Sequence, residues 1–428
     1  MTALTSLASL LSPRRWKLLT RVALALAGLT LLVSVVHEQA GELGTCTGEL
    51  GTCTGELGTC TGELGTCTGE LGFAGALLSW SASAADAEHS ENEAKSCVLL
   101  STADGATELP ELYEDVVPDV AASNVYLMET SHAAAVLPRG LCGLESYCKL
   151  NPQASVWFLV TAQSLEPPTL AALKALQAAY QNLCVAHVNF TSLFKDTPLL
   201  ELYHSEKFNN TSHKIHNLSD MSRVALVYKF GGLYSDMDVI ALRPLVGATN
   251  FIALQDDGTG YLNHAIHRMR RHHPMLLRVM KHVAANYNGQ TWAANGPTAM
   301  SDVARLLGCD LKPVGLDRLV NATHYRTSQQ IQPCNATNPC SNQTEGCDWV
   351  ALRSNAFMAV HYDAAYKLFL GPEKNETSPP IQTLYPDSLG LHFFNYMTRD
   401  KEVQSGSHMH RLASEFCPVV AKKHPLLA

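Results

Sequence analysis

The stretch Gly231-Gly232-Leu233-Tyr234-Ser235-Asp236-Met237-Asp238 places two aspartates, one residue apart, directly after a glycine turn. The residues before it, 219–230, have the pattern of a helix. The residues after it, 239–242, are apolar and β-prone until Arg243-Pro244 ends the strand. Two carboxylates at a strand end suit a hard divalent cation that keeps coordination positions open for phosphate oxygens. The stretch therefore predicts a nucleotide-sugar site.

On both sides of this turn, apolar strands alternate with helices. The strand 156–160 is apolar throughout, as in a parallel strand that is covered on both faces. Further strands are predicted at 124–130 and 185–188, and helices at 141–150, 170–180, 273–287 and 298–307. This alternation predicts an α/β domain whose ligand site lies at the carboxyl edge of its strands.

The composition indicates a sizeable core and no basic face. The 428 residues are 46% apolar and 16% charged, and the formal net charge is −8. Lysines and arginines are scattered, apart from one N-terminal cluster, so we expect no nucleic-acid partner.

That cluster, Arg14-Arg15-Trp16-Lys17 with Arg21, flanks an apolar segment at 18–36. The segment is long enough to cross a thin early-secretory membrane at a tilt, with Arg21 reaching back to the interface. Positive charge on its N-terminal flank predicts a cytosolic tail at 1–17 and a luminal remainder, which is a single-pass type II topology. A signal peptide cleaved near Ala40 is the alternative that the sequence leaves open.

Residues 37–96 are a low-complexity stem. It contains, at 41–68, four copies of Gly-Glu-Leu-Gly-Thr-Cys-Thr. The period of seven matches a coiled coil, but the two glycines in each copy cost about 1 kcal/mol apiece in a helix. One leucine in each copy is also too little to bury, so we predict a linker without regular structure.

Sequons and cysteines both favour the secretory lumen. Eight Asn-x-Ser/Thr sequons follow the apolar segment, at Asn189, Asn209, Asn210, Asn217, Asn321, Asn335, Asn342 and Asn375. The nine cysteines beyond the stem are expected to pair mostly as disulfides in an oxidising compartment, and their connectivity stays open. Cys334, Cys340 and Cys347 lack a C-x-x-C pair, so disulfides are favoured over zinc there.

The block from Lys229-Phe230-Gly231-Gly232 through Asp238, with the blocks given below, resembles the α1,4-glycosyltransferases, a family that includes lactosylceramide 4-α-galactosyltransferase and α1,4-N-acetylglucosaminyltransferase. The most specific block is 229–238, and the similarity covers about 97–423. Two residues depart from the family: Ser235 replaces a large apolar residue, and Phe394 replaces a tryptophan. The other matching blocks, in the family's order, are 127–131, 142–146, 196–199, 219–223, 262–265, 295–297, 356–366, 392–395 and 417–418.

The resemblance implies a GT-A-like fold with a mixed, mostly parallel central sheet. It divides the domain into a DXD-containing nucleotide-sugar-binding half at 97–260 and a C-terminal half at 261–423. It also implies a metal-dependent retaining hexosyltransferase of the Golgi membrane, which moves galactose or N-acetylgalactosamine from a UDP-sugar onto a glycosphingolipid in α1,4 linkage. The donor sugar, the acceptor, any nucleophile and a homodimer stay open, as does α1,4-N-acetylglucosaminyl transfer to glycoproteins.

By the same resemblance, Asp236 and Asp238 are the catalytic pair. Asp238 is expected to bind Mn²⁺ or Mg²⁺, which accept carboxylate oxygens, and Asp236 to bind the ribose or share the metal. His392 is a candidate third ligand, and its alternative is a packed, hydrogen-bonded histidine. The expected substrate-binding residues are Asp220, Arg223, Gly231, Gly232, Tyr234, Asn263, Gly296, His392 and Asn395.

For Arg223 and for the pair Asp256 and Asp257, the sequence allows two interpretations each. Arg223 could hold a phosphate or the ribose, or it could form a buried ion pair with Asp220 that braces the turn. Asp256 and Asp257 follow the next strand and could contact the transferred sugar or belong to a surface loop.

Two other functions use similar residues. Phosphatases of the haloacid dehalogenase type need an apolar strand that runs directly into the first aspartate, whereas here Gly231 and Gly232 interrupt it. A non-catalytic luminal sugar-binding protein is the second alternative, and the intact pair Asp236 and Asp238 argues against it.

Overall fold

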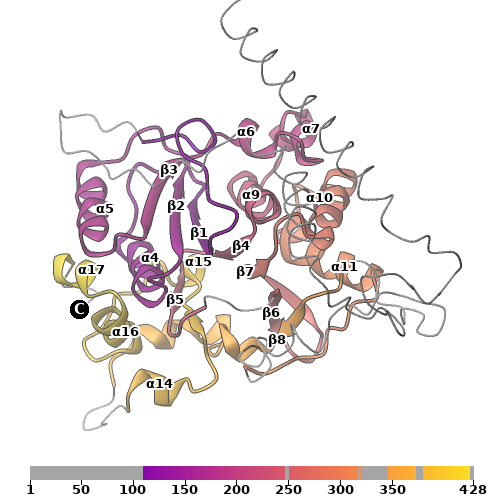
Figure 1. The fold of residues 1–428 in the computed structure, drawn as a ribbon. Helices are drawn as coiled ribbons and strands as arrows, with labels where there is room; N and C mark the ends of the chain where they lie inside the picture. The colour runs from indigo at the N-terminus through magenta and orange to yellow at the C-terminus, as the bar shows by residue number, and fades with distance from the viewer. Residues whose placement is uncertain (1–108, 246–249, 317–318, 320–345, 373–378, 425–428) are drawn as a thin grey trace, which may run out of the picture. The chain divides into compact units, whose positions relative to one another are not determined.

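Seven strands form the central sheet, in the order β3-β2-β1-β4-β7-β6-β8, and helices flank both of its faces (Figure 1). This computed structural model describes residues 109–245, 250–316, 319, 346–372 and 379–424. All of them belong to one compact unit, Asn92–Ala428. The predicted tail, membrane segment and stem lie outside the described residues.

The sheet is mixed and mostly parallel, as predicted. Strands β1 to β4 are parallel, β7 runs antiparallel to its neighbours β4 and β6, and β8 is parallel to β6. The strands are β1 (Asn124–Glu129), β2 (Ser155–Val160), β3 (Leu183–His187), β4 (Gly232–Ser235), β6 (Phe251–Asp256), β7 (Tyr261–Met269) and β8 (Val350–Leu352). Because β7 pairs with both β4 and β6, the two predicted halves of the domain share one sheet.

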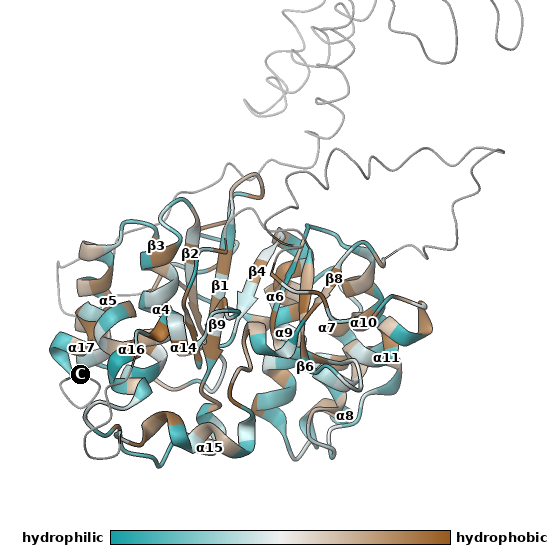
Figure 2. Ribbon diagram, turned by 90° about the horizontal axis from the view of Figure 1, so that it is seen from below, coloured by the Kyte–Doolittle hydropathy of each residue, from teal (hydrophilic) through white to brown (hydrophobic). Residues whose placement is uncertain are grey.

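Two hydrophobic cores lie on the two faces of the sheet. Along β1, Val125 and Leu127 face one core, whereas Tyr126 and Met128 face the other, as the period of two in a strand requires. Helices α4, α5, α16 and α17 cover the first face, and α9, α10 and α11 cover the second (Figure 1). In Figure 2 the strands between these helices are coloured mostly apolar. Each strand is thus buried on both sides, which explains the continuous apolar pattern of β2.

The predicted helices are confirmed, with boundaries shifted by a few residues. Helix α4 begins at Pro138 because proline is well accepted at the first helical position. The helices are α4 (Pro138–Leu150), α5 (Pro167–Ala179), α6 (Phe190–Phe194), α7 (Leu199–Tyr203), α8 (Glu206–Asn209), α9 (Lys214–Phe230), α10 (Pro274–Asn286), α11 (Ala299–Leu306), α14 (Ile381–Leu384), α15 (Asn395–Thr398), α16 (His408–Phe416) and α17 (Pro418–Lys423). A π-helix, η2 (Ala294–Thr298), precedes α11, and two 3₁₀ helices are η3 (Ser354–Ala356) and η4 (Tyr362–Phe369).

The chain order reverses between β1 and β4, since β2 and β3 lie on the far side of β1. In open α/β sheets, ligands bind beyond the carboxyl ends of the strands at such a reversal. Strand β4 ends at Ser235, directly before Asp236. The fold therefore places the DXD turn at the point where a ligand site is expected.

A small second sheet joins the C-terminal part of the chain to this turn. Strand β5 (Val239–Ala241) pairs antiparallel with β9 (Gly390–His392), and Val239 stands opposite His392. A disulfide between Cys142 and Cys417 ties α4 to the residue before α17, and a second disulfide joins Cys309 to Cys347. Cys148 is buried and free.

Disulfide formation by part of the cysteines is thus confirmed, whereas Cys97, Cys334 and Cys340 lie outside the described residues. Within the described ranges, no helix combines the length and the apolar character needed to cross a membrane.

Candidate active site

Helix α4 packs directly against the backbone of the DXD turn. A Cβ atom at Gly143 would lie 2.3 Å from the carbonyl oxygen of Met237, and one at Gly140 would lie 3.0 Å from Cε of Met237. Only glycine at 143 allows this approach of helix to turn. Ser235 accepts a hydrogen bond of 2.8 Å from the hydroxyl of buried Tyr147. The hydroxyl of Ser235 therefore has a buried partner at the end of β4.

Asp238 is held between two residues from the C-terminal end of the domain. Its Oδ1 lies 3.1 Å from Nε2 of His392, and its Oδ2 accepts a hydrogen bond of 2.8 Å from the backbone amide of Asn395. Burial alone would raise the pKa of Asp238, but the charge of His392 and both hydrogen bonds lower it below its ordinary value. Asp238 is therefore an anionic carboxylate at the carboxyl edge of the sheet.

Asp236 is turned toward Arg223. The Nη1 atom of Arg223 lies 3.0 Å from Oδ1 of Asp236, and the hydroxyl of Tyr234 donates to the same oxygen at 2.8 Å. Arg223 also donates to the carbonyl of His264 at 3.0 Å and to the hydroxyl of Ser219 at 2.6 Å, and its guanidinium lies 4.8 Å from the centre of the Tyr234 ring. Burial and the charge of Asp238 raise the pKa of Asp236, against the lowering effect of Arg223.

These contacts identify Arg223 and Tyr234 as residues that hold Asp236. Both are buried, and neither presents a free group to a ligand. Of the two interpretations of Arg223, the bracing ion pair is the one that the structure shows. Its closer carboxylate is Asp236, however, because Asp220 lies 3.6 Å away. The i, i+3 spacing of Asp220 and Arg223 concealed this pairing across the turn.

Asp220 lies beneath the π-helix η2. A Cβ atom at Gly296 would lie 2.4 Å from the carboxyl carbon of Asp220, so glycine is required where η2 crosses α9. Oδ1 of Asp220 is 3.3 Å from Nδ1 of buried His264. The pKa of Asp220, which burial alone would raise, is lowered by the hydrogen bond from His264 and by the charge of Arg223.

Asn263 is fixed by its neighbours on the sheet. Its side chain donates to Oε1 of Gln255 at 2.6 Å and accepts from the amide of Ala265 at 2.7 Å. Gln255 was not predicted as a site residue, yet its Nε2 is buried without a partner among the described residues. The sequence carries no signal for this, because the burial of the Gln255 amide is set by the fold.

Asp256 stabilises its own turn, and Asp257 holds the first residue of η3. They accept from the amides of Thr259 and Ser354, at 2.7 and 2.6 Å, and both are exposed. The surface-loop interpretation therefore describes this pair.

The structure does not bring Gly231 and Gly232 to the DXD turn. They lie at the amino end of β4, with positive φ angles of 69° and 113°. A Cβ atom at Gly232 would lie 2.5 Å from the carbonyl oxygen of Asn124, which opens β1. Both glycines thus form the sharp connection from α9 to β4, at the edge of the sheet opposite the aspartates.

Comparison with known proteins agrees with this geometry. The family model described as "Glycosyltransferase sugar-binding region containing DXD motif" matches residues 138–258, and the model described as "Alpha 1,4-glycosyltransferase conserved region" matches residues 268–324 and 325–424. Lactosylceramide 4-alpha-galactosyltransferase of Mus musculus is 31% identical over 304 residues, which are 70% of this chain and 75% of the mouse protein. The chain belongs to the α1,4-glycosyltransferase family. It is accordingly a hexosyltransferase.

The names of other relatives of this glycosyltransferase specify different transferred sugars. Alpha-1,4-N-acetylglucosaminyltransferase of Homo sapiens is 30% identical over 187 residues, which are 42% of this chain and 54% of the human protein. A solved structure of the galactosyltransferase LgtC with donor and acceptor sugar analogs covers 70% of this chain and 95% of its own, at 13% identity and a TM-score of 0.31.

Family members with a DXD motif typically use a divalent metal. In this glycosyltransferase, Asp238 and His392 are placed to bind such an ion, whereas Asp236 is not. Two ligands at neighbouring corners of an octahedral Mg²⁺ site are about 2.9 Å apart, close to the 3.1 Å between Asp238 and His392. Nδ1 of His392 and Oδ1 of Asn395 are buried without a partner among the described residues. The expected trio is not assembled: Asp236 is paired with Arg223, and the described residues contain no cluster of three such ligands.

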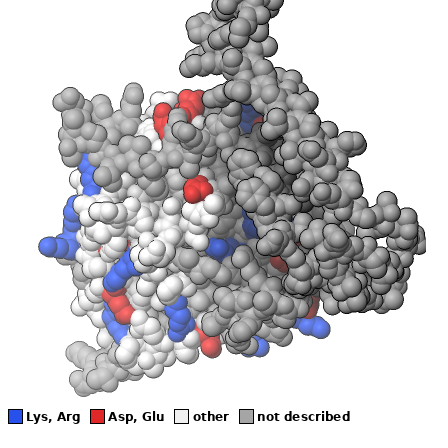
Figure 3. Space-filling view, viewed as in Figure 1, with Lys and Arg blue, Asp and Glu red and all other residues white. Residues whose placement is uncertain are grey.

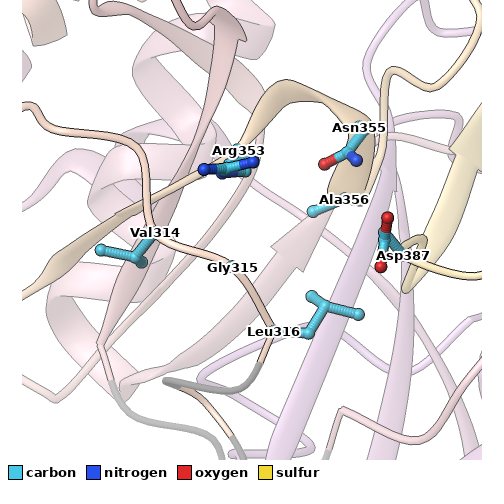
Figure 4. Close-up of a pocket in the computed structure, with 7 residues that line it drawn as sticks. All are labelled: Val314, Gly315, Leu316, Arg353, Asn355, Ala356 and Asp387. Carbon is cyan, nitrogen blue, oxygen red and sulfur yellow. The ribbon is translucent and has the colours of Figure 1, made fainter.

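A pocket of about 380 Å³ is formed by other residues. It is lined by Val314, Gly315, Leu316, Arg353, Asn355, Ala356 and Asp387 (Figure 4). None of them is a predicted site residue, and Leu316 borders residues that the structure does not describe. The face shown in Figure 3 carries acidic and basic side chains interspersed over its described part. We therefore centre the candidate active site on the DXD turn and not on this pocket.

Proposed function

We propose that this glycosyltransferase moves galactose or N-acetylgalactosamine from a UDP-sugar onto the terminal sugar of a glycosphingolipid, in α1,4 linkage and with retention. The observation that carries the proposal is the position of Asp238, which is kept anionic between His392 and Asn395 at the switch point of the sheet. The family assignment supports the reaction class, and the 31% identical mouse relative supports the acceptor class.

The residues of the site divide the work. Asp238 and His392 would hold a divalent cation, Mn²⁺ or Mg²⁺, which when bound neutralises the charge that develops on the leaving diphosphate. Arg223 and Tyr234 hold the carboxylate of Asp236, and the charge of Arg223 offsets the repulsion between Asp236 and Asp238. In our proposal, a hydroxyl group of the UDP-sugar donates a hydrogen bond to Oδ1 of Asn395, which has no partner among the described residues. The tight packing of α4 against Met237 keeps the turn in place during turnover.

We further propose that the chain is a type II protein of the Golgi membrane. The basic cluster before the apolar residues 18–36 and the eight sequons beyond them support this location. The two disulfides are consistent with an oxidising lumen.

The proposal can be tested by UDP release from the full-length chain in detergent. UDP-galactose, UDP-N-acetylgalactosamine and UDP-N-acetylglucosamine are supplied separately, each with lactosylceramide or mactosylceramide, and each with Mn²⁺ or with chelator. We expect release that depends on both metal and acceptor with one of the first two donors, and a product that an α-glycosidase of matching specificity removes.

Other outcomes assign other functions. Release with UDP-N-acetylglucosamine alone would show that the chain transfers N-acetylglucosamine, the sugar in the name of the human relative. Binding of a UDP-sugar without transfer to any acceptor would indicate a sugar-binding protein.

A further inference from the structure

Three exposed aromatic rings from distant parts of the chain contact one another. The ring of His216 lies 4.0 Å from that of Trp292, and the ring of Trp292 lies 5.1 Å from that of Tyr396, measured between centroids. His216 closes the triangle with Tyr396 at 5.9 Å. We call His216, Trp292 and Tyr396 the aromatic cluster.

The aromatic cluster does not serve either hydrophobic core. Trp292 is 46% exposed and Tyr396 is 57% exposed, and neither belongs to a core cluster. Large aromatic rings are normally buried to a high degree because each can remove 150–250 Å² of surface from water. Their mutual contacts instead hold the rings in fixed positions at the surface, which is the arrangement of a preformed binding platform.

Each ring is joined to the candidate active site by a short piece of chain. Tyr396 directly follows Asn395, whose amide binds Asp238. His216 lies one helical turn before Asp220 on α9. Trp292 precedes η2, in which Gly296 packs against the carboxyl group of Asp220. The aromatic cluster is therefore at the rim of the site, within a few residues of the groups that define it.

From this juxtaposition we infer that the aromatic cluster binds the terminal hexose of the acceptor glycan by stacking, with the hexose positioned for attack beside Asp238. The inference deepens the proposed function and rests on it for the identity of the acceptor as a glycan.

The chemistry of a hexose matches the cluster. One face of a galactose ring presents several C–H groups, whose hydrogens carry partial positive charge, and the face of an aromatic ring is negative. Trp292 and Tyr396 are tilted by 35° relative to each other, so their two ring faces are adjacent but not coplanar. Polar groups at the edge of the cluster, including the guanidinium of Arg399 at 5.4 Å from the Tyr396 ring, are available to the hydroxyl groups of a sugar.

The exposure of the cluster favours the acceptor over the donor nucleotide. Small ligands and cofactors usually lose 70–90% of their surface in a pocket, whereas about half of each large ring here faces solvent. An acceptor glycan that remains attached to a larger carrier needs an open platform of this kind.

The test measures acceptor and donor kinetics separately in the full-length chain. Trp292→Ala and Tyr396→Ala are each expected to raise the KM for soluble methyl β-lactoside about tenfold, the effect of losing one aromatic contact. The KM for UDP-galactose should stay within about twofold of the unmodified protein. Trp292→Phe should restore most of the affinity, and Leu306→Ala, which removes an exposed side chain on α11, should change neither constant. Binding of methyl β-lactoside is measured in parallel by saturation-transfer NMR with UDP and Mn²⁺ present.

Each outcome has one meaning. An unchanged lactoside KM in both alanine variants overturns the inference and leaves the proposed function standing. A rise confined to the KM for UDP-galactose has the same two consequences, and it would indicate that the rings bind the nucleobase. A rise with lactosylceramide micelles but not with methyl β-lactoside would indicate a lipid-binding surface and also overturns it. Lactoside binding that Trp292→Ala abolishes, without transfer from any donor, supports the sugar platform while the proposed function fails. Absence of lactoside binding to the unmodified protein contradicts the inference.

Discussion

Nε2 of His392 lies 3.1 Å from Oδ1 of Asp238, because the pairing of β5 with β9 sets His392 opposite Val239. This distance fits two ligands of one octahedral cation, and it also fits a simple hydrogen bond. The two roles differ in what a substitution does. His392→Gln keeps a hydrogen-bond donor toward Asp238 but removes the imidazole nitrogen that would bind Mn²⁺.

For His392→Gln we expect the Mn²⁺ concentration at half-maximal activity to rise about 10- to 100-fold, the range found when the surroundings of a metal are disturbed. Titration of UDP release with Mn²⁺ measures it. An unchanged Mn²⁺ dependence together with full activity would show that His392 only packs against Asp238.

Arg223 is expected to be important for stability. Arg223→Met leaves the partly buried carboxylate of Asp236 near Asp238 without its cation, which should lower the free energy of unfolding by up to about 3–5 kcal/mol. The matched control is Arg305→Met, since Arg305 pairs with Asp302 at the same i, i+3 spacing, 3.3 Å apart, on the exposed face of α11. Its loss should cost at most about 1 kcal/mol. Urea denaturation compares the two variants, and equal losses would contradict the role given to Arg223.

Gly143→Ala tests whether α4 sets the position of the DXD turn. Alanine is the better helix former by about 1 kcal/mol, so the change should stabilise α4 in isolation. The methyl group would, however, lie 2.3 Å from the carbonyl oxygen of Met237. We expect a net loss of about 1–3 kcal/mol and reduced activity, because backbone atoms must move. Gly258→Ala, where the nearest atom is 3.5 Å away, should be close to neutral. A stabilised and fully active Gly143→Ala protein would contradict this packing.

The strands and helices could be predicted from the sequence because their apolar periodicity is local. The antiparallel insertion of β7 between β4 and β6 could not, since no local pattern reports the order of strands. The aspartate pair was identifiable from its own turn, whereas His392 and Asn395 were suggested only by the family resemblance. The i, i+3 spacing suggests Asp220 as the ion-pair partner of Arg223, but in the structure Asp236, in the turn after β4, lies closer. The aromatic cluster could not be predicted, because its three rings meet only in the folded chain.

Asn217 is a sequon that the fold makes unavailable. It is buried, its amide donates to Thr211 and to the hydroxyl of Tyr287, and it accepts from Asn295. A glycan there would break these bonds, whereas Asn189, Asn209 and Asn210 are exposed. We expect mass spectrometry of peptides from chain expressed in the secretory pathway to find glycans among the three exposed sites and none at Asn217. A glycan on Asn217 in active protein would contradict the packing of α9 against η2.

The most direct test of the metal-dependent transfer is UDP release by the full-length chain and by Asp238→Asn, measured side by side with and without Mn²⁺. Asparagine keeps the size of the side chain and removes its charge, so the fold should persist. Asp302→Asn, on the exposed face of α11, serves as the control for a lost surface carboxylate. We predict that the unmodified chain and Asp302→Asn release UDP only with metal, and that Asp238→Asn is at least about 100-fold slower. Release by Asp238→Asn at a rate near that of the unmodified chain would contradict the assignment of Asp238 to the metal and the diphosphate.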